Sequence, residues 1–326
     1  MKALPLVVGL TLATSALAET PELIVYAPDY FASDWGPGPG IEARFEERCG
    51  CDLVYRTGDL LPRLLLEGDG TEADVAIGFS SDLTKRARES GLFVPHGQDL
   101  SALTLPIHWT DEVFLPFNYS HAAFVYDATR VAEAPTSFAA LVEAPEDLRL
   151  VIQDPRSSVS GLALALWVQQ VFGEGAGDAW AALAPKIVTV TQGWSEAYGL
   201  FTDGEADMVL SFTTSPAYHI VAEEDLTKKA AIFQEGHYLL VESAAQVAGS
   251  DQPELAAQFM AFILSEDFQA MIPTTNWSFP AALPETAWPQ AFRDLPLPET
   301  VLLYSEDEAA EIRDTAIEAW RRGLSN

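Results

Sequence analysis

Four aromatic side chains in loops or at the ends of predicted elements are the first candidates for chemistry in this chain. They are Trp35, Trp194, Tyr218 and Trp277. Aromatic faces attract organic cations with about 0.5–2 kcal/mol per contact. Taken singly, a packing role in the core is the more common fate of such a residue. Together, in an acidic protein, they favour a site for a flat cationic heterocycle.

Polar groups lie beside two of these aromatics. Thr213, Thr214 and Ser215 follow an apolar run and could hydrogen-bond the polar edge of a ligand, or simply form a turn. The segment 153–161, QDPRSSVSG, stands where a predicted strand ends and a helix starts. Free backbone N–H groups and the helix dipole suit a phosphate or carboxylate there, with Ser157 and Ser158 as further donors. Plain helix capping by a serine is the alternative.

The elements that position these groups form a predicted β-α-β unit. Apolar runs at 188–191 and 208–212 read as strands, and 195–201 between them reads as a helix. Ligands of open α/β sheets collect outside the carboxyl ends of the strands. Trp194 and the hydroxyl residues after 212 occupy such ends, so we expect a small-molecule site there.

The rest of the chain predicts two α/β lobes. Strands and helices alternate from residue 21 to about 91, with Asp59 as a helix cap, and alternate again from Pro135. Long β-rich runs at 112–126 and 236–248 are suited to connect the lobes, with the ligand in a cleft between them. We expect these parts: signal peptide 1–18, lobe 1 at 19–120 and 240–280, lobe 2 at 121–239, and a C-terminal helical segment at 281–326 that packs on the lobes.

The N-terminus predicts export. Met1-Lys2 precedes an apolar stretch, and Ala16-Leu17-Ala18 fits a signal-peptidase site. No later stretch reaches the roughly 20 apolar residues that a membrane span needs. We therefore expect a mature chain that starts at Glu19, is released into the periplasm and is not embedded in the membrane.

Charge and cysteine content narrow the class of protein. The net charge of −30 over 326 residues argues against nucleic acid as a partner, because such binding needs clustered Lys and Arg. The two cysteines, Cys49 and Cys51, favour a short structural disulfide in an oxidising compartment. The five histidines show no metal-ligand spacing, and neither a G-x-S-x-G nor an H-E-x-x-H motif occurs. The sequence thus predicts no catalytic residue, no metal and no cofactor.

Long motifs resemble the periplasmic thiamine-binding proteins of bacterial ABC transporters. They lie between Asp29 and Trp277, across nearly the whole mature chain. The motifs are DYFASDWGPGPG, FEERCGCDL, GLFVP, FVYD, QDPRSS, KIVTVTQGWSEAYGLF, LSFTTSPAYHI, EGHYL, QPELAAQF and IPTTNW.

The resemblance implies a type II periplasmic binding protein fold, α/β, with two lobes joined by two hinge strands around a ligand cleft. It implies capture of thiamine or its mono- and diphosphate, and delivery to a membrane permease and its ATPase. It implies ligand contacts at Ser158, Val159, Trp194, Phe212, Thr213, Thr214 and Ser215, and an aromatic enclosure with Trp35, Tyr218 and Trp277.

Three departures from the family pattern affect the site. Pro28 stands where the family often has a Tyr, and Phe212 where a Tyr is usual. The loop at 56–59 is short, which leaves open whether Thr57, Gly58 or Asp59 takes the contact of the family's Asp-Gly loop.

Two alternatives from other classes stay open at this point. One is a thiaminase-like enzyme on the same fold, which would need a cysteine nucleophile in the cleft. The other is a binder of a different small cation, such as ferric ion or a polyamine. A ferric site would require clustered Tyr, His and carboxylate ligands.

Overall fold

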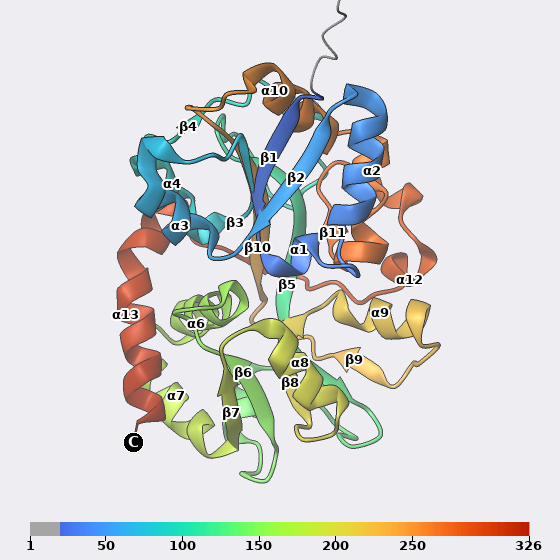
Figure 1. Cartoon of the computed structure of the whole chain (residues 1–326). Coiled ribbons are helices and arrows are strands. Elements are labelled where there is room, and N and C mark those ends of the chain that lie inside the picture. Colours follow the sequence, from blue (N-terminus) through green and yellow to red (C-terminus); the bar gives the residue numbers. More distant parts are fainter. Residues whose placement is uncertain (1–19, 326) are drawn as a thin grey trace, which may run out of the picture.

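The computed structural model describes residues 20–325 (Figure 1). The predicted signal peptide, 1–18, lies outside the described residues. None of the described helices is both long and apolar enough to cross a lipid bilayer.

Twelve strands form one continuous hydrogen-bonded sheet. Its main path runs β2 (Asp52–Thr57), β1 (Glu22–Ala27), β3 (Val75–Ser80), β10 (His237–Val247), β5 (Leu115–Asp127), β8 (Met208–Phe212), β6 (Leu150–Gln153), β7 (Ile187–Thr191). Short strands pair at its side: β4 (Phe93–Val94), β9 (Lys228–Ala230), β11 (Phe279–Pro280) and β12 (Val301–Leu302). Parallel strands occupy both ends of the path, and the antiparallel β10 and β5 lie in its middle.

The first lobe surrounds β2, β1 and β3. Its helices are α1 (Asp29–Ala32), α2 (Gly38–Cys49), α3 (Leu60–Glu67), α4 (Thr84–Glu89), α10 (Pro253–Ile263) and α11 (Glu266–Gln269). On one side of the sheet, Phe45 of α2 packs edge-on against Phe259 of α10 at 5.1 Å between ring centroids. The α2 helix is capped by Gly50 in the left-handed conformation, and Cys49, its last residue, forms a disulfide with Cys51, with 5.2 Å between their Cα atoms.

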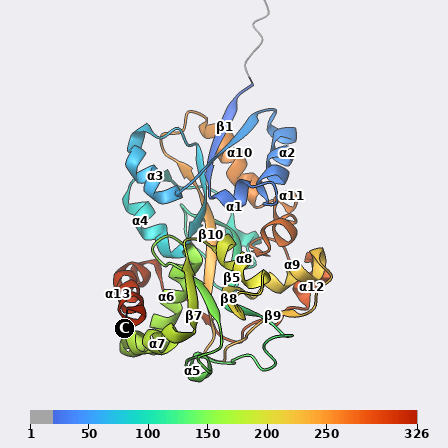
Figure 2. The same cartoon turned by 60° about the horizontal axis from the view of Figure 1, so that its bottom comes forward.

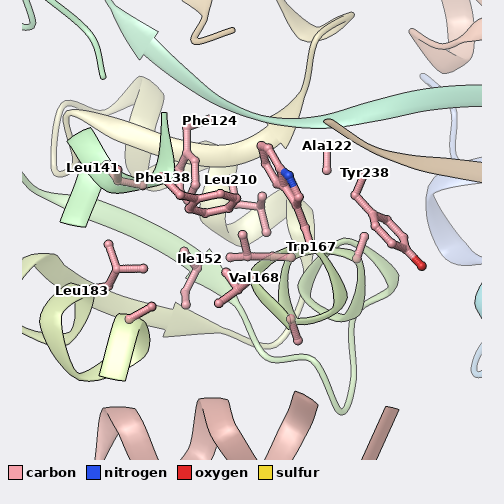
Figure 3. Packing of buried hydrophobic residues seen from close by; sticks show 14 of the residues in the cluster. Ala122, Phe124, Phe138, Leu141, Ile152, Trp167, Val168, Leu183, Leu210 and Tyr238 are labelled. Carbon is pink, nitrogen blue, oxygen red and sulfur yellow. The ribbon is translucent and has the colours of Figure 1, made fainter. Parts of the chain in front are cut away.

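The second lobe surrounds β8, β6 and β7. Its helices are α5 (Phe138–Glu143), α6 (Val159–Phe172), α7 (Ala176–Leu183), α8 (Trp194–Thr202) and α9 (Ser215–Ala222). Figure 3 shows its largest core, in which Trp167 of α6 packs among Phe138, Ile152 and Leu210. Because α6 is apolar on nearly all sides, it is buried rather than amphipathic.

Two long strands connect the lobes, as the sequence predicts. β5 and β10 pair antiparallel from Leu239↔His121 to Ala244↔Leu115. Each continues beyond this segment, β10 onto β3 in the first lobe and β5 onto β8 in the second. Nearly every residue of both strands is buried. The expected two-lobe α/β fold with two hinge strands is confirmed.

The C-terminal residues lie against both lobes. After α12 (Gln290–Arg293), helix α13 (Glu306–Leu324) starts at a capping box made by Ser305 and Glu308. Its side chains Ala316, Ala319 and Trp320 join the core of the second lobe. At its other end Glu306 accepts hydrogen bonds from Arg88 of α4, so the helix spans the two lobes along one side (Figures 1 and 2).

Two local predictions differ from the structure. Asp59 takes the N-cap position of α3, but its side chain caps no N–H group. Ser215, for which a turn is one of the two interpretations, begins helix α9 instead. The first N–H groups of a helix have no partner within the helix, so the missing N–H of Pro216 costs nothing in the first turn. A helix can therefore begin at this Ser-Pro step.

The hinge strand β5 contains a buried histidine, His121, that should affect how stability depends on pH. Its side chain is 4% exposed, and neither ring nitrogen has a hydrogen-bond partner among the described residues. Burial, with a smaller contribution from His237, lowers the pKa of His121 to about 4. The folded protein therefore keeps this ring neutral in a range where the unfolded chain, with a histidine pKa near about 6.5, binds a proton.

We predict that His121→Phe flattens the pH dependence of stability. Only the unfolded chain binds a proton at His121 in this range. The free energy of unfolding should therefore fall by about 1 kcal/mol on account of His121 when the pH is lowered from about 7.5 to about 5.5. The phenyl variant should lose correspondingly less free energy of unfolding over that interval. Denaturant melts at both pH values measure the difference, and equal declines in the two proteins would contradict the prediction.

Candidate ligand-binding site

Trp194 is fixed by contacts on two sides. It is the first residue of α8, directly after the turn that follows β7. Its ring stacks on that of Tyr198 with 4.7 Å between centroids and 25° between planes. Its indole N–H donates to the Ser211 hydroxyl at 2.8 Å. One face of the indole is thus covered by Tyr198, and the ring has a set orientation.

A set of hydroxyl groups continues from Ser211. The hydroxyls of Ser211 and Ser215 share a hydrogen bond of 2.7 Å, and the Phe212 N–H donates to the Ser215 hydroxyl at 3.3 Å. Thr213 and Thr214 are fully buried, and their hydroxyls have no partner among the described residues. Most buried polar groups in native structures have a hydrogen-bond partner, so the two unpaired hydroxyls are candidates for hydrogen bonds to a ligand.

Tyr198, which stacks on Trp194, is itself hydrogen-bonded to helix α9. The Tyr198 hydroxyl is hydrogen-bonded to Nε2 of His219 at 2.9 Å, and Nδ1 of His219 lies 2.6 Å from the Glu223 carboxylate. Burial raises the pKa of the Tyr198 hydroxyl, so it stays protonated. Sequence reasoning missed Tyr198 and His219, although the four-residue spacing of Trp194 and Tyr198 places them on one helix face.

His219, Glu223 and Asp225 are close enough to hold a metal ion, with candidate ligand atoms within 4.8 Å of one another. Each of them already has a partner. His219 is hydrogen-bonded to Tyr198 and Glu223, and Asp225 accepts from Lys228 and from the Thr227 N–H. The group is therefore a satisfied polar cluster that supports the site.

The predicted anion site at 153–161 is a capped helix start linked to β8. Ser158 is the N-cap of α6, and its hydroxyl accepts weakly from the Gly161 N–H at 3.4 Å while also bonding Ser160. Ser160 donates to the Gln153 side chain, whose amide donates to the Leu210 carbonyl. The capping interpretation is therefore confirmed for Ser158, and the anion site stays a prediction.

Ser157 and the ion pair beside it lie at the edge of this turn. The Ser157 hydroxyl donates to the Gln192 carbonyl at 2.8 Å. Hydrogen bonds from Arg156 outweigh burial and lower the pKa of Asp154. That carboxylate therefore remains charged and paired with Arg156, and Ser157 serves the fold of the loop.

The remaining aromatic candidates differ in their surroundings. Trp277, in the left-handed conformation with φ 55°, meets Tyr218 edge to face at 5.2 Å between ring centroids. Trp277 precedes β11, which pairs with β5 beside the first lobe, whereas Tyr218 belongs to α9 of the second. This contact therefore joins candidate residues of the two lobes. Trp35 is 56% exposed, more than any other tryptophan of the described chain.

Gly58 and Asp59 lie apart from this group. They follow β2 at the edge of the sheet, and Gly58 has φ 140°. The hydrogen bonds and ring contacts of residues 20–325 connect neither of them, nor Trp35, to the group around Trp194.

Two hollows occur on the described surface. One is lined by Phe45, Arg48 and Phe262. The other lies by Gly68, Leu92 and Gly249. Neither hollow is lined by a predicted ligand residue.

Comparisons with known proteins decide the family. Residues 37–270 match the model of the bacterial extracellular solute-binding proteins. The chain belongs to that family. It is 46% identical over 328 residues to the thiamine-binding periplasmic protein of Escherichia coli K12, with 99% of each chain covered.

Solved structures of solute-binding proteins agree with the fold. A periplasmic thiamin binding protein superposes with a TM-score of 0.91 at 45% identity, covering 97% of this chain and 100% of that one. Iron-bound HitA from Pseudomonas aeruginosa superposes with a TM-score of 0.75 at 21% identity, over 93% and 99% of the chains. The resemblance to periplasmic thiamine-binding proteins is confirmed, and the more distant likeness shows that the two-lobe fold serves different ligands.

The structure predicts which aromatics of this solute-binding protein carry stability. Tyr198→Ala should lower the free energy of unfolding by about 3–5 kcal/mol, because a buried ring of the core is removed. Trp35→Ala should change it by about 0.5 kcal/mol or less, as expected for an exposed side chain. Chemical denaturation measures both, and a large loss at Trp35 would show that its ring packs.

Proposed function

We propose that this chain is the periplasmic binding component of a bacterial ABC transporter, and that it captures thiamine and its phosphate esters for a membrane permease and ATPase. The observation that carries the proposal is the likeness to thiamine-binding periplasmic proteins along almost the whole chain. The names of the relatives also support the predicted export to the periplasm through residues 1–18.

The chemistry of the candidate residues fits thiamine. Its thiazolium ring carries a permanent positive charge, which suits the faces of Trp194, Tyr218 and Trp277. The unpartnered hydroxyls of Thr213 and Thr214, with Ser215, suit its polar substituents or a phosphate. A phosphate also suits Ser158 and Val159 at the start of α6.

The proposed site takes residues from both lobes. Phe212 contributes backbone at the end of β8, while Trp35, Gly58 and Asp59 approach from the first lobe when the cleft closes on the ligand. We propose that lobe 1 consists of residues 19–120 and 240–280, and lobe 2 of residues 121–239. Residues 281–326 form a C-terminal segment that packs on both lobes. Lobe closure, rather than bond breaking, is the expected event.

The alternatives lack support from the site. A thiaminase-like reaction needs a cysteine thiolate, and both cysteines of the chain are joined in the disulfide at the end of α2. A ferric site needs free Tyr and His ligands, whereas His219 is bonded through both ring nitrogens. We therefore propose a binding protein without catalytic activity, cofactor or resident metal.

We predict that Trp194→Ala and Trp277→Ala each weaken thiamine binding by about 1–3 kcal/mol, the scale of a lost aromatic stack. Titration calorimetry of the folded variants measures the effect. Trp194→Phe and Trp277→Phe serve as matched controls that keep an aromatic face and should lose less. Unchanged affinity in both alanine variants would refute this site.

We predict that thiamine stays intact when it is incubated with the protein and a small nucleophile. The reason is the absence of a free thiol among the described residues. Chromatography of the mixture detects the released pyrimidine. Protein-dependent release would favour the enzyme over the transporter component.

A further inference from the structure

One carboxylate at the centre of the sheet is buried without a cation. Glu242 of β10 is 7% exposed. Its oxygens accept hydrogen bonds from the Tyr30 hydroxyl and, at 2.7 Å, from the Asn118 side chain. No Lys, Arg or His of residues 20–325 forms an ion pair with it. A lone charge in such a place is strongly disfavoured unless a positive group joins it.

Glu242 lies level with the carboxyl ends of the parallel strands in the first lobe. On β10 it lies between Ser80 of β3 and Asn118 of β5 in the sheet register. Ser80 is the last residue of β3, so Glu242 stands at the carboxyl edge of the parallel strands of the first lobe. Open α/β sheets bind their ligands at this edge.

The neighbours of Glu242 belong to segments that carry proposed aromatic contacts. Tyr30 lies on α1, directly before the loop that bears Trp35. The Asn276 side chain lies close enough to the Glu242 carboxylate to lower its pKa, and Trp277 is the next residue. The carboxylate is therefore tied to both sources of aromatic rings in the first lobe, and a charge there acts close to the proposed cleft.

We propose that Glu242 is the charge-selecting residue of this binding site: its carboxylate supplies the negative charge that the positive ring of a cationic ligand neutralises when the lobes close. The proposal rests on the proposed function, because it takes thiamine as the ligand. It assigns the preference for a cation to one residue of the first lobe, in addition to the aromatic faces.

The polar surroundings of Glu242 are consistent with this role. Burial raises its pKa, and the hydrogen bonds from Tyr30 and Asn118 oppose that rise without cancelling it. The raised pKa means that the protein surroundings alone disfavour the charged form of Glu242. A cation nearby would favour the charged form and be held by it.

The test compares thiamine with a neutral isostere in which carbon replaces the quaternary ring nitrogen. In Glu242→Gln the amide keeps the shape and loses the charge. We expect the affinity for thiamine to fall about tenfold or more, and the affinity for the isostere to change by less than about threefold. Titration calorimetry with both ligands measures the two values, and thermal melts show that the variant is folded.

Asp82→Asn is the matched control. Asp82 is likewise a buried carboxylate held by a tyrosine, since the Tyr238 hydroxyl donates to it at 2.7 Å, but its hydrogen-bond partners among the described residues, Ser80 and Tyr238, are not candidate ligand residues. Both affinities should stay unchanged in this variant. A loss of thiamine affinity equal to that of Glu242→Gln would overturn the assignment to Glu242.

The other outcomes are equally clear. Equal losses for thiamine and the isostere in Glu242→Gln would mean that the residue only shapes the site, and no loss for either would mean that it takes no part. In the wild-type protein, equal affinities for the two ligands would overturn charge selection without any variant. Wild-type protein that binds neither ligand would refute the proposed function itself, and the inference with it.

Discussion

The antiparallel pairing of β5 with β10 is the constraint on which the rest of the structure depends. These two strands are the middle of a sheet whose parallel ends belong to different lobes. Because their residues are buried on both faces, they cannot shift register without exposing apolar side chains on one lobe or the other. The pairing therefore sets where the carboxyl edges of the two parallel sets stand relative to each other.

The functional groups follow from this arrangement. In each lobe the candidate ligand residues lie at the carboxyl ends of the parallel strands. The second lobe contributes Trp194 and the residues after β8, and the first lobe contributes Glu242 and its neighbours. The two edges are rigid for different reasons. Trp194 is held by Tyr198 and Ser211, whereas Glu242 is held by Tyr30 and Asn118. The contact of Tyr218 with Trp277 is the place where the described side chains of the two sets meet. Binding in our account depends on bringing these two edges together around the ligand.

Sequence patterns predicted most of the elements and part of the site. Alternation of apolar runs placed β1, β2, β3, β6, β7 and β8, and the length of two runs predicted the hinge strands. Residue type alone made Thr213–Ser215 candidates for ligand contacts, which stays a prediction. Helix α9 was missed because its Ser-Pro start resembles a turn. Glu242 and Tyr30 were missed because they are 212 residues apart and only the sheet order brings them together. Partnerships across such distances depend on register, and residue types do not reveal register.

The central claim is that the chain binds thiamine or its phosphates between its lobes, and native mass spectrometry of the purified protein tests it most directly. The protein is mixed with equal amounts of thiamine, its monophosphate, its diphosphate, a polyamine and ferric citrate. We predict a single adduct per chain with the mass of a thiamine compound. An adduct with the mass of the polyamine or of iron, or a chain that stays unloaded, would contradict the account.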